Sequence, residues 1–170
     1  MKRPSDIGKS TAESVAAVRL AFIEAARPIE DAMSATNHGF TIELREVTAL
    51  VDGLPLREPL PDAIRRFVSD PIRSVRPIKP ASRWPQLLHA VMQPMRPWRL
   101  GRYGATFDSG PGPTLDEILS LAETLESHLG SAQVAARVEL MPAGYYANIF
   151  EHFVVITRSH AALLALMVTD

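Results

Sequence analysis

Residues 145–157 read YYANIFEHFVVIT, an apolar stretch that is interrupted by the pair Glu151-His152. Side chains alternate between the two faces of a sheet along a strand, so Glu151 and His152 would point to opposite faces unless a bulge turns one of them. Each face is otherwise occupied mainly by aromatic and β-branched residues. The stretch therefore predicts a central strand that carries one polar group in a partly buried position.

Two further stretches, one on each side, also have the pattern of strands. Residues 133–141 alternate apolar and polar side chains, and residues 162–168 read ALLALMV. The links between these three stretches are short, and residues 142–144 (Pro-Ala-Gly) form a turn in the first of them. Consecutive strands with short links pair in antiparallel order, which predicts a three-stranded meander.

The remaining long elements are predicted from spacing and from terminal signals. Thr114 and Glu117 have the spacing of a capping box at the start of an apolar helical stripe that ends near residue 129. Residues 10–35 form a second amphipathic segment, which Pro28 is expected to kink or to divide into two helices. Residues 40–50 alternate apolar and polar side chains and predict a strand.

The middle of the chain is rich in proline and arginine. Eleven of the 14 prolines lie between Pro55 and Pro113. Each proline removes a backbone donor and restricts the residue before it, which favours loops and short elements. Short helices are predicted at residues 61–69 and 85–93, and a strand is predicted at residues 98–107.

These elements predict an α+β fold, in which two longer helices pack on one face of an antiparallel sheet of four to five strands and the Pro/Arg-rich middle is irregular. A chain of 170 residues is long enough for one core, so we expect a single domain over residues 1–170, with residues 1–9 as a flexible extension.

Composition narrows the class of protein further. The chain has no cysteine, which excludes disulfides, thiolate nucleophiles and cysteine-ligated metals. No apolar run approaches the roughly 20 residues that cross a bilayer, and the N-terminus lacks the apolar core of a secretion signal. We therefore expect a cytoplasmic protein that has no contact with membranes.

The net charge of −1 conceals an uneven distribution. Residues 57–102 contain ten basic and three acidic side chains, whereas the rest of the chain is acidic. Arginine, which binds carboxylates and phosphates through two parallel hydrogen bonds, supplies nearly all of the basic side chains. The overall negative charge makes nucleic acid a poorer fit than an acidic protein.

Three residues of the 145–157 stretch are candidates for proton transfer, namely Glu151, His152 and Tyr146. A partly buried carboxylate or imidazole beside a tyrosine has the chemistry of a general base. The alternative is that Glu151 lies at the rim of the sheet and that His152 is a hydrogen-bonded core histidine. The five histidines show no metal-ligand spacing, and no nucleophile elbow or phosphate loop is present, so neither a metal nor another cofactor is expected.

The basic middle supplies the candidate binding residues. Residues 73–85 read RSVRPIKPASRWP and would form an exposed arm, in which Arg76, Lys79 and Arg83 meet an acidic partner and Trp84 is an aromatic anchor. The full set of candidates is Arg73, Arg76, Arg83, Trp84, Trp98, Arg99 and Arg102. The alternative is that these arginines pair with the chain's own acidic segments, such as the helix over residues 116–126.

Three functions remain open at this point, and whether the protein is an enzyme is left open with them. The favoured one is a small binding protein without catalytic activity, which engages an acidic partner through its Arg-rich, aromatic-containing surface. The first alternative acts on or binds a small anionic metabolite, which Arg99 or Arg102 would hold while Glu151 or His152 acts as general base. The second is a homo-oligomeric subunit in which the strand over residues 162–168 pairs edge to edge with another copy.

Overall fold

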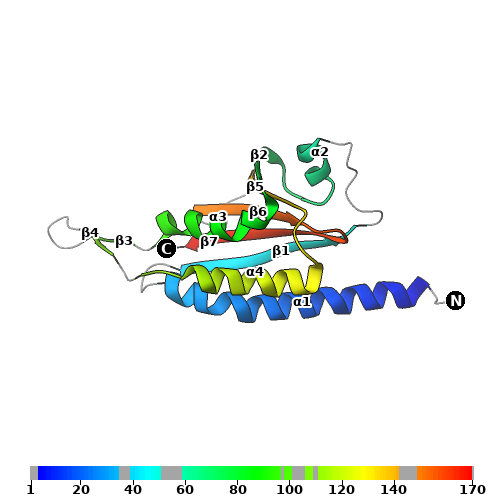
Figure 1. The fold of residues 1–170 in the computed structure, drawn as a ribbon, viewed down its shortest axis with the longest axis horizontal. Helices are drawn as coiled ribbons and strands as arrows, with labels where there is room; N and C mark the ends of the chain where they lie inside the picture. Colours follow the sequence, from blue (N-terminus) through cyan, green and yellow to red (C-terminus); the bar gives the residue numbers. More distant parts are fainter. Residues whose placement is uncertain are drawn as a thin grey trace.

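The computed structural model describes residues 4–34, 39–50, 59–96, 98–100, 106–108, 111–141 and 149–169. Figure 1 shows how these segments are arranged in space. The helices are α1 (Pro4–Met33), α2 (Leu60–Arg65), α3 (Trp84–Met92) and α4 (Leu115–Leu129), with 3₁₀ turns η1 (Ala81–Arg83) and η2 (Gln93–Met95). The strands are β1 (Gly39–Ala49), β2 (Ile72–Ile78), β3 (Trp98–Leu100), β4 (Thr106–Asp108), β5 (Val134–Leu140), β6 (Ile149–Ile156) and β7 (His160–Thr169).

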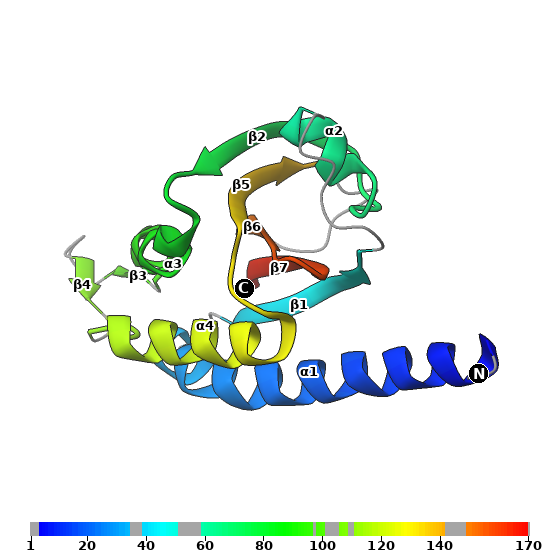
Figure 2. The ribbon, with the colours of Figure 1, turned by 45° about the vertical axis from the view of Figure 1, so that its right-hand side comes forward.

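Five of the strands form one antiparallel sheet in the order β1-β7-β6-β5-β2. The strands β5, β6 and β7 follow one another in sequence and in space, which confirms the predicted meander. The sheet curves strongly between β1 and β2, as Figure 2 shows. Among the described strands, the short strands β3 and β4 pair with each other and with no other. The α+β prediction, with its five-stranded antiparallel sheet and its longer helices, is therefore confirmed.

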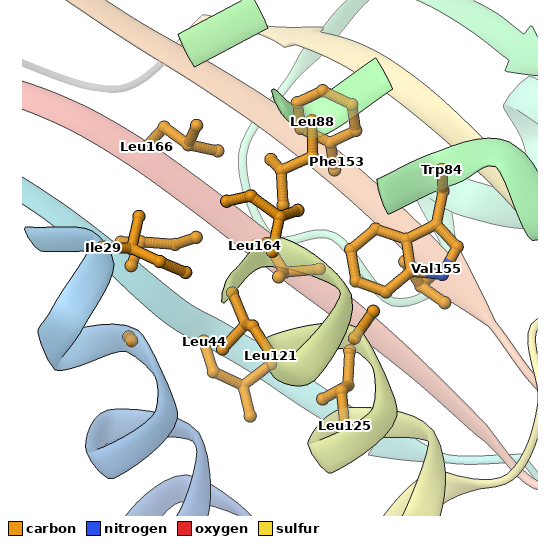
Figure 3. Close-up of a cluster of buried hydrophobic side chains, with 14 of the residues drawn as sticks. Ile29, Leu44, Trp84, Leu88, Leu121, Leu125, Phe153, Val155, Leu164 and Leu166 are labelled. Atoms are coloured by element: carbon orange, nitrogen blue, oxygen red, sulfur yellow. The ribbon is translucent and has the colours of Figure 1, made fainter. Parts of the chain in front are cut away.

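The two faces of the sheet are covered by different elements. On the first face, α1, α3 and α4 pack against Leu44, Phe153 and Leu164 and form the larger core, which Figure 3 shows in close-up. On the second face, Ile64 of α2 and Val68 pack against Val154, Leu163 and their neighbours in a smaller core. Because β6 contributes buried residues to both cores, its apolar sequence on both faces is explained.

Both long helices are present, but only α4 follows its sequence signal closely. Both hydrogen bonds of the predicted capping box are present at the start of α4, where Thr114 accepts from the backbone N–H of Glu117 and the Glu117 side chain accepts from the backbone N–H of Thr114. The helix α1 begins at Pro4 and remains one helix through Pro28, so the predicted division into two helices does not occur. None of the helices in the described segments is long and apolar enough to cross a bilayer.

The prediction of an exposed arm over residues 73–85 is wrong, because its first half is the strand β2 of the main sheet. Pro77 lies opposite Ala136 of β5. A proline is tolerated in a strand at the edge of a sheet, where the lost N–H does not interrupt a ladder on both sides. The density of prolines therefore indicated an edge strand here and not the absence of a strand.

The prediction that residues 162–168 offer a free edge is also wrong. The strand β7 pairs with β1 on one side and with β6 on the other, and nearly all of its side chains are buried. Its apolar sequence is explained by this position in the interior of the sheet. Pairing of β7 with a second copy of the chain would require β1 or β6 to be displaced.

Candidate functional site

A polar groove of about 320 Å³ lies over β2, β5 and β6. Strand alternation places Ser74 and Arg76 on the first face, together with the core residue Ile78. The residues that line the groove are Ser74, Arg76, Arg137, Val138, Glu139, Phe150, Glu151 and His152. Five of these eight residues are charged or hydroxyl-bearing side chains on the first face, so the groove is suited to polar ligands.

Arg137 of β5 and Glu151 of β6 form a two-point ion pair inside the groove. The Nε of Arg137 donates to Oε2 of Glu151 at 2.7 Å, and Nη2 donates to Oε1. The two side chains are 34% and 23% exposed, so the pair is partly shielded from water. Paired hydrogen bonds of this kind fix both side chains. Both carboxylate oxygens of Glu151 are therefore bonded to Arg137.

Glu139 is likewise bonded within the chain. Its Oε2 accepts a hydrogen bond of 3.0 Å from the Ser74 hydroxyl, and its Oε1 lies 3.2 Å from Nη1 of Arg73. Both members of the Arg73–Glu139 pair are about half exposed or more, so the pair contributes little to stability. Arg73 nevertheless has an acidic partner in its own chain, which agrees with the alternative prediction that these arginines pair with acidic segments of the same chain.

Arg76 differs from Arg137, the other arginine that lines the groove. It lies directly opposite Arg137 in the β2–β5 ladder, and like charges at such a position repel each other. Glu151 neutralises Arg137, whereas Arg76 is exposed and has no acidic partner among the described residues. Lys79 and Arg83, which follow β2, are also exposed and also lack a described acidic partner. We refer to Arg76, Lys79 and Arg83 as the basic edge.

His152 borders the groove from behind and points to the second face. Its side chain is only 1% exposed, and its ring lies 5.6 Å from the ring of Phe150. The pKa of His152 is lowered to about 4, chiefly by burial and also by the positive charge of Arg45, while the negative charge of Asp70 opposes the shift. The imidazole is therefore neutral at pH 7, and it offers almost no surface to a ligand in the groove.

Arg45 and Asp70 belong to a small network that links the two edge strands across the second face. Nη2 of Arg45 lies 2.9 Å from Oδ2 of Asp70, and the carboxylate of Glu46 accepts hydrogen bonds from the backbone N–H and the hydroxyl of Ser69. Arg45 and Glu46 lie at a register shift of β1, and Ser69 and Asp70 lie just before β2. We refer to these contacts as the edge link.

The structure separates the residues that were predicted to transfer protons. Glu151 is bonded to Arg137 on the first face, and His152 is buried on the second, as strand alternation predicted. Tyr146 lies outside the described residues. Among the described residues, no group of three or more His, Asp or Glu side chains could hold a metal ion.

The prediction that Trp84 is a surface anchor is wrong. Trp84 is fully buried at the start of α3, where its Nε1 donates a 3.0 Å hydrogen bond to Oε1 of Glu126. Figure 3 shows its ring among the side chains of the first core. The sequence did contain a signal for this position, because Trp84, Leu88 and Met92 have the four-residue spacing of one helical face.

The other predicted binding residues fall into three groups. Arg76 and Arg83 belong to the basic edge, and Arg73 is paired with Glu139. The backbones of Trp98 and Arg99 lie in β3, but their side chains and all of Arg102 lie outside the described part of the structure.

The sequence patterns did not indicate three residues of the groove, namely Ser74, Arg137 and Glu139. The two-residue spacing of Arg137 and Glu139 within one strand placed them on a common face, but only the pairing with β2 shows what they contact.

No family model, no curated protein and no solved structure matched the chain. Proton transfer requires an accessible base, whereas the groove carboxylates are bonded to arginines and its histidine is buried. Recognition of an anion requires an accessible guanidinium, which Arg76 provides.

Proposed function

We propose that this chain is a binding protein that holds an acidic partner protein through its basic edge. The observation that carries the proposal is the contrast among the arginines of the middle segment. Arg65 and Arg73 have acidic partners within the chain, whereas Arg76, Lys79 and Arg83 are exposed and have none among the described residues. Exposed cations without internal partners are available to an acidic surface.

The position of the basic edge supports a protein ligand over a small metabolite. Sites for small molecules are enclosed and mostly apolar, with a few polar groups that orient the ligand. The groove beside Arg76 is lined mainly by charged side chains, and two of its carboxylates would repel an anion that entered it. Arg76 lies at the outer side of this groove, because β2 is the last strand of the sheet. A partner that approaches from outside can reach Arg76 without meeting Glu139 and Glu151 first.

The proposal is tested by capture of the partner with matched charge-reversal variants. The tagged chain would be isolated from the cells that make it, at low ionic strength, and the proteins that accompany it would be identified by mass spectrometry. The double variant Arg76→Glu/Arg83→Glu should lose an acidic partner that the wild type retains. The control Arg27→Glu/Arg158→Glu changes two exposed arginines elsewhere, alters the net charge equally, and should retain it.

Two results would contradict the proposal. One is equal retention of the partner by both double variants, because the basic edge would then be irrelevant. The other is a complex that does not weaken as salt is raised from 50 to about 500 mM, because contacts between exposed charges are screened over this range. Circular dichroism of both variants would establish that each one is folded.

A further inference from the structure

The two edges of the sheet differ in how their backbone groups are satisfied. At the β1 edge, the Glu30 side chain accepts a 2.9 Å hydrogen bond from the backbone N–H of Ile42. Arg19 donates hydrogen bonds to the carbonyls of Leu44 and Arg45 at 2.6 and 3.1 Å. Both Glu30 and Arg19 come from α1, which runs beside β1 in Figures 1 and 2. Side chains of α1 therefore occupy backbone groups along this edge.

The β2 edge has no comparable cover. No described side chain bonds to the main chain of residues 72–78, and Figure 2 shows β2 as the outermost strand on its side of the sheet. An edge strand has unpaired N–H and C=O groups on its outer side, which can pair with another extended chain. Pro77 removes only one donor from the seven residues of β2.

The charges on the first face form a row that is incomplete at this edge. Proceeding outward from β6, the row consists of Glu151, Arg137 and Arg76. Both oxygens of Glu151 are bonded to Arg137, so Glu151 is not available to Arg76, which has no described acid on its outer side either. A strand added beside β2 would lie about 4.8 Å away, where an acidic side chain would complete the row.

We propose that β2 accepts an extended segment of the partner as an additional strand of the sheet. The segment alternates acidic and apolar residues, with an acidic side chain beside Arg76 on the first face. Its apolar side chains lie beside Val75 and Pro77, which point to the second face, where Val75 already packs against the smaller core. Backbone hydrogen bonds supply affinity and the alternating side chains supply specificity. The inference rests on the proposed function, since the segment belongs to the acidic partner.

A second copy of the chain is a poorer occupant of the same edge. Pairing of two β2 strands would bring two copies of Arg76 and Lys79 together, without any described acid to neutralise them. Positive charge on an edge strand is a common means of preventing such self-association. An acidic segment from a different protein converts the same charges into an attraction.

The test uses a synthetic peptide of seven residues, the length of β2, in which Val and Glu alternate. Binding to the ¹⁵N-labelled protein would be followed by shifts of the backbone amide signals. Signals of residues 72–76 and 78, the residues of β2 that carry a backbone N–H, should shift on titration, whereas signals of β1 should not. The variant Arg76→Glu should bind the peptide about tenfold more weakly or worse, and Arg27→Glu should bind it within about twofold of the wild type.

Two methylated forms of the peptide separate strand addition from charge attraction alone. One carries methyl groups on the backbone nitrogens of its Glu residues, and the other on those of its internal Val residues. Only one set of nitrogens faces β2 in an added strand, so one form should lose about tenfold or more in affinity while the other binds nearly as well as the parent. The protein itself is unaltered, so misfolding cannot imitate this result.

The possible failures are distinguishable. If both methylated forms or neither form lost affinity while Arg76→Glu still weakened binding, strand addition would be overturned and the proposed function would stand. If Arg76→Glu bound the peptide as the wild type does, both proposals would fail. If sedimentation showed a dimer in which the amides of β2 become protected from exchange, the occupant would be a second copy and the inference would be wrong.

Discussion

The edge strands β1 and β2 both have backbone N–H and C=O groups on the side that faces away from the sheet, and they differ in what lies beside those groups. The 11-residue strand β1 has backbone groups bonded by Arg19 and Glu30 of α1, whereas the seven-residue strand β2 is bordered by exposed cations and a proline. Side chains that bond directly to an edge make it unavailable to other chains. Charges make an edge selective, because they repel copies of themselves and attract the opposite sign. We propose that the long edge serves stability and the short edge serves recognition.

Acidification should have the largest effect, because it acts on the link between the two edges. The pKa of His152 is lowered from 6.5 to about 4 in the folded state, so the unfolded chain takes up a proton first as the pH falls. Stability from this residue is therefore complete above pH 6.5 and is lost progressively toward pH 4. A shift of this size corresponds to about 3 kcal/mol. Protonated His152 would also repel Arg45 of the edge link, and its attraction to Asp70 would offset part of this repulsion.

Urea unfolding measured between pH 7 and pH 4 would check this expectation. The variant His152→Leu removes the titrating group and should show a smaller loss of unfolding free energy over the same range. His128→Gln, which changes an exposed histidine of α4, should lose stability as the wild type does. If the unfolding free energy of the wild type fell no more than that of His152→Leu, burial of His152 would not be the cause of the loss of stability at low pH.

Opening the β1 edge should have the next largest effect. The double variant Arg19→Ala/Glu30→Ala leaves the N–H of Ile42 and the carbonyls of Leu44 and Arg45 without these partners. We expect it to lose about 2 kcal/mol of unfolding free energy, since water can replace part of what is removed. Urea denaturation would measure the loss, and sedimentation would show whether the opened edge now pairs with other copies. If the unfolding free energy of the variant equalled that of the wild type, the bonds from α1 would not stabilise the β1 edge, and the proposed difference between the two edges would be wrong.

Changing the β2 edge should have the smallest effect on stability. Arg76→Ala removes an exposed cation that faces Arg137 and has no described acidic partner. We expect the unfolding free energy to change by less than about 0.5 kcal/mol, with a slight gain if relief of the repulsion dominates. The same urea assay would detect a larger loss, which would show that Arg76 serves stability and not recognition.

The sequence predicted the parts of the fold that depend on local signals. The capping box at Thr114 and the alternation in β5, β6 and β7 were sufficient to place the α4 helix and the meander. The strand β2 was missed because a proline disfavours a strand locally, and only its position at the edge of the sheet makes Pro77 acceptable. A local sequence pattern does not show whether a strand lies at the edge or in the interior of a sheet.

The candidate site was only partly predictable for a similar reason. The sequence indicated Arg76 and Arg83, and alternation alone separated Glu151 from His152. The environment of Arg76 depends on the β2–β5 register, which sets it opposite Arg137, and on the neighbouring strand that supplies Glu151. The first contact joins residues that are about 60 positions apart in the sequence. The second joins residues that are 14 positions apart, but on different strands. A single sequence reveals neither pairing. Trp84 was predicted at the surface because aromatic residues often anchor partners, whereas its four-residue spacing with Leu88 and Met92 indicated a buried helical face.

The pairing of β1 with β7 has a consequence for how the chain folds. Gly39 lies opposite Thr169, so this ladder joins segments that are separated by most of the chain. During synthesis β1 must therefore wait until β7 has left the ribosome, whereas β5, β6 and β7 are consecutive in the sequence and pair with their neighbours. We expect the meander to form early and β1 to join it late. In the interval, the nascent chain would display exposed apolar surface that chaperones recognise.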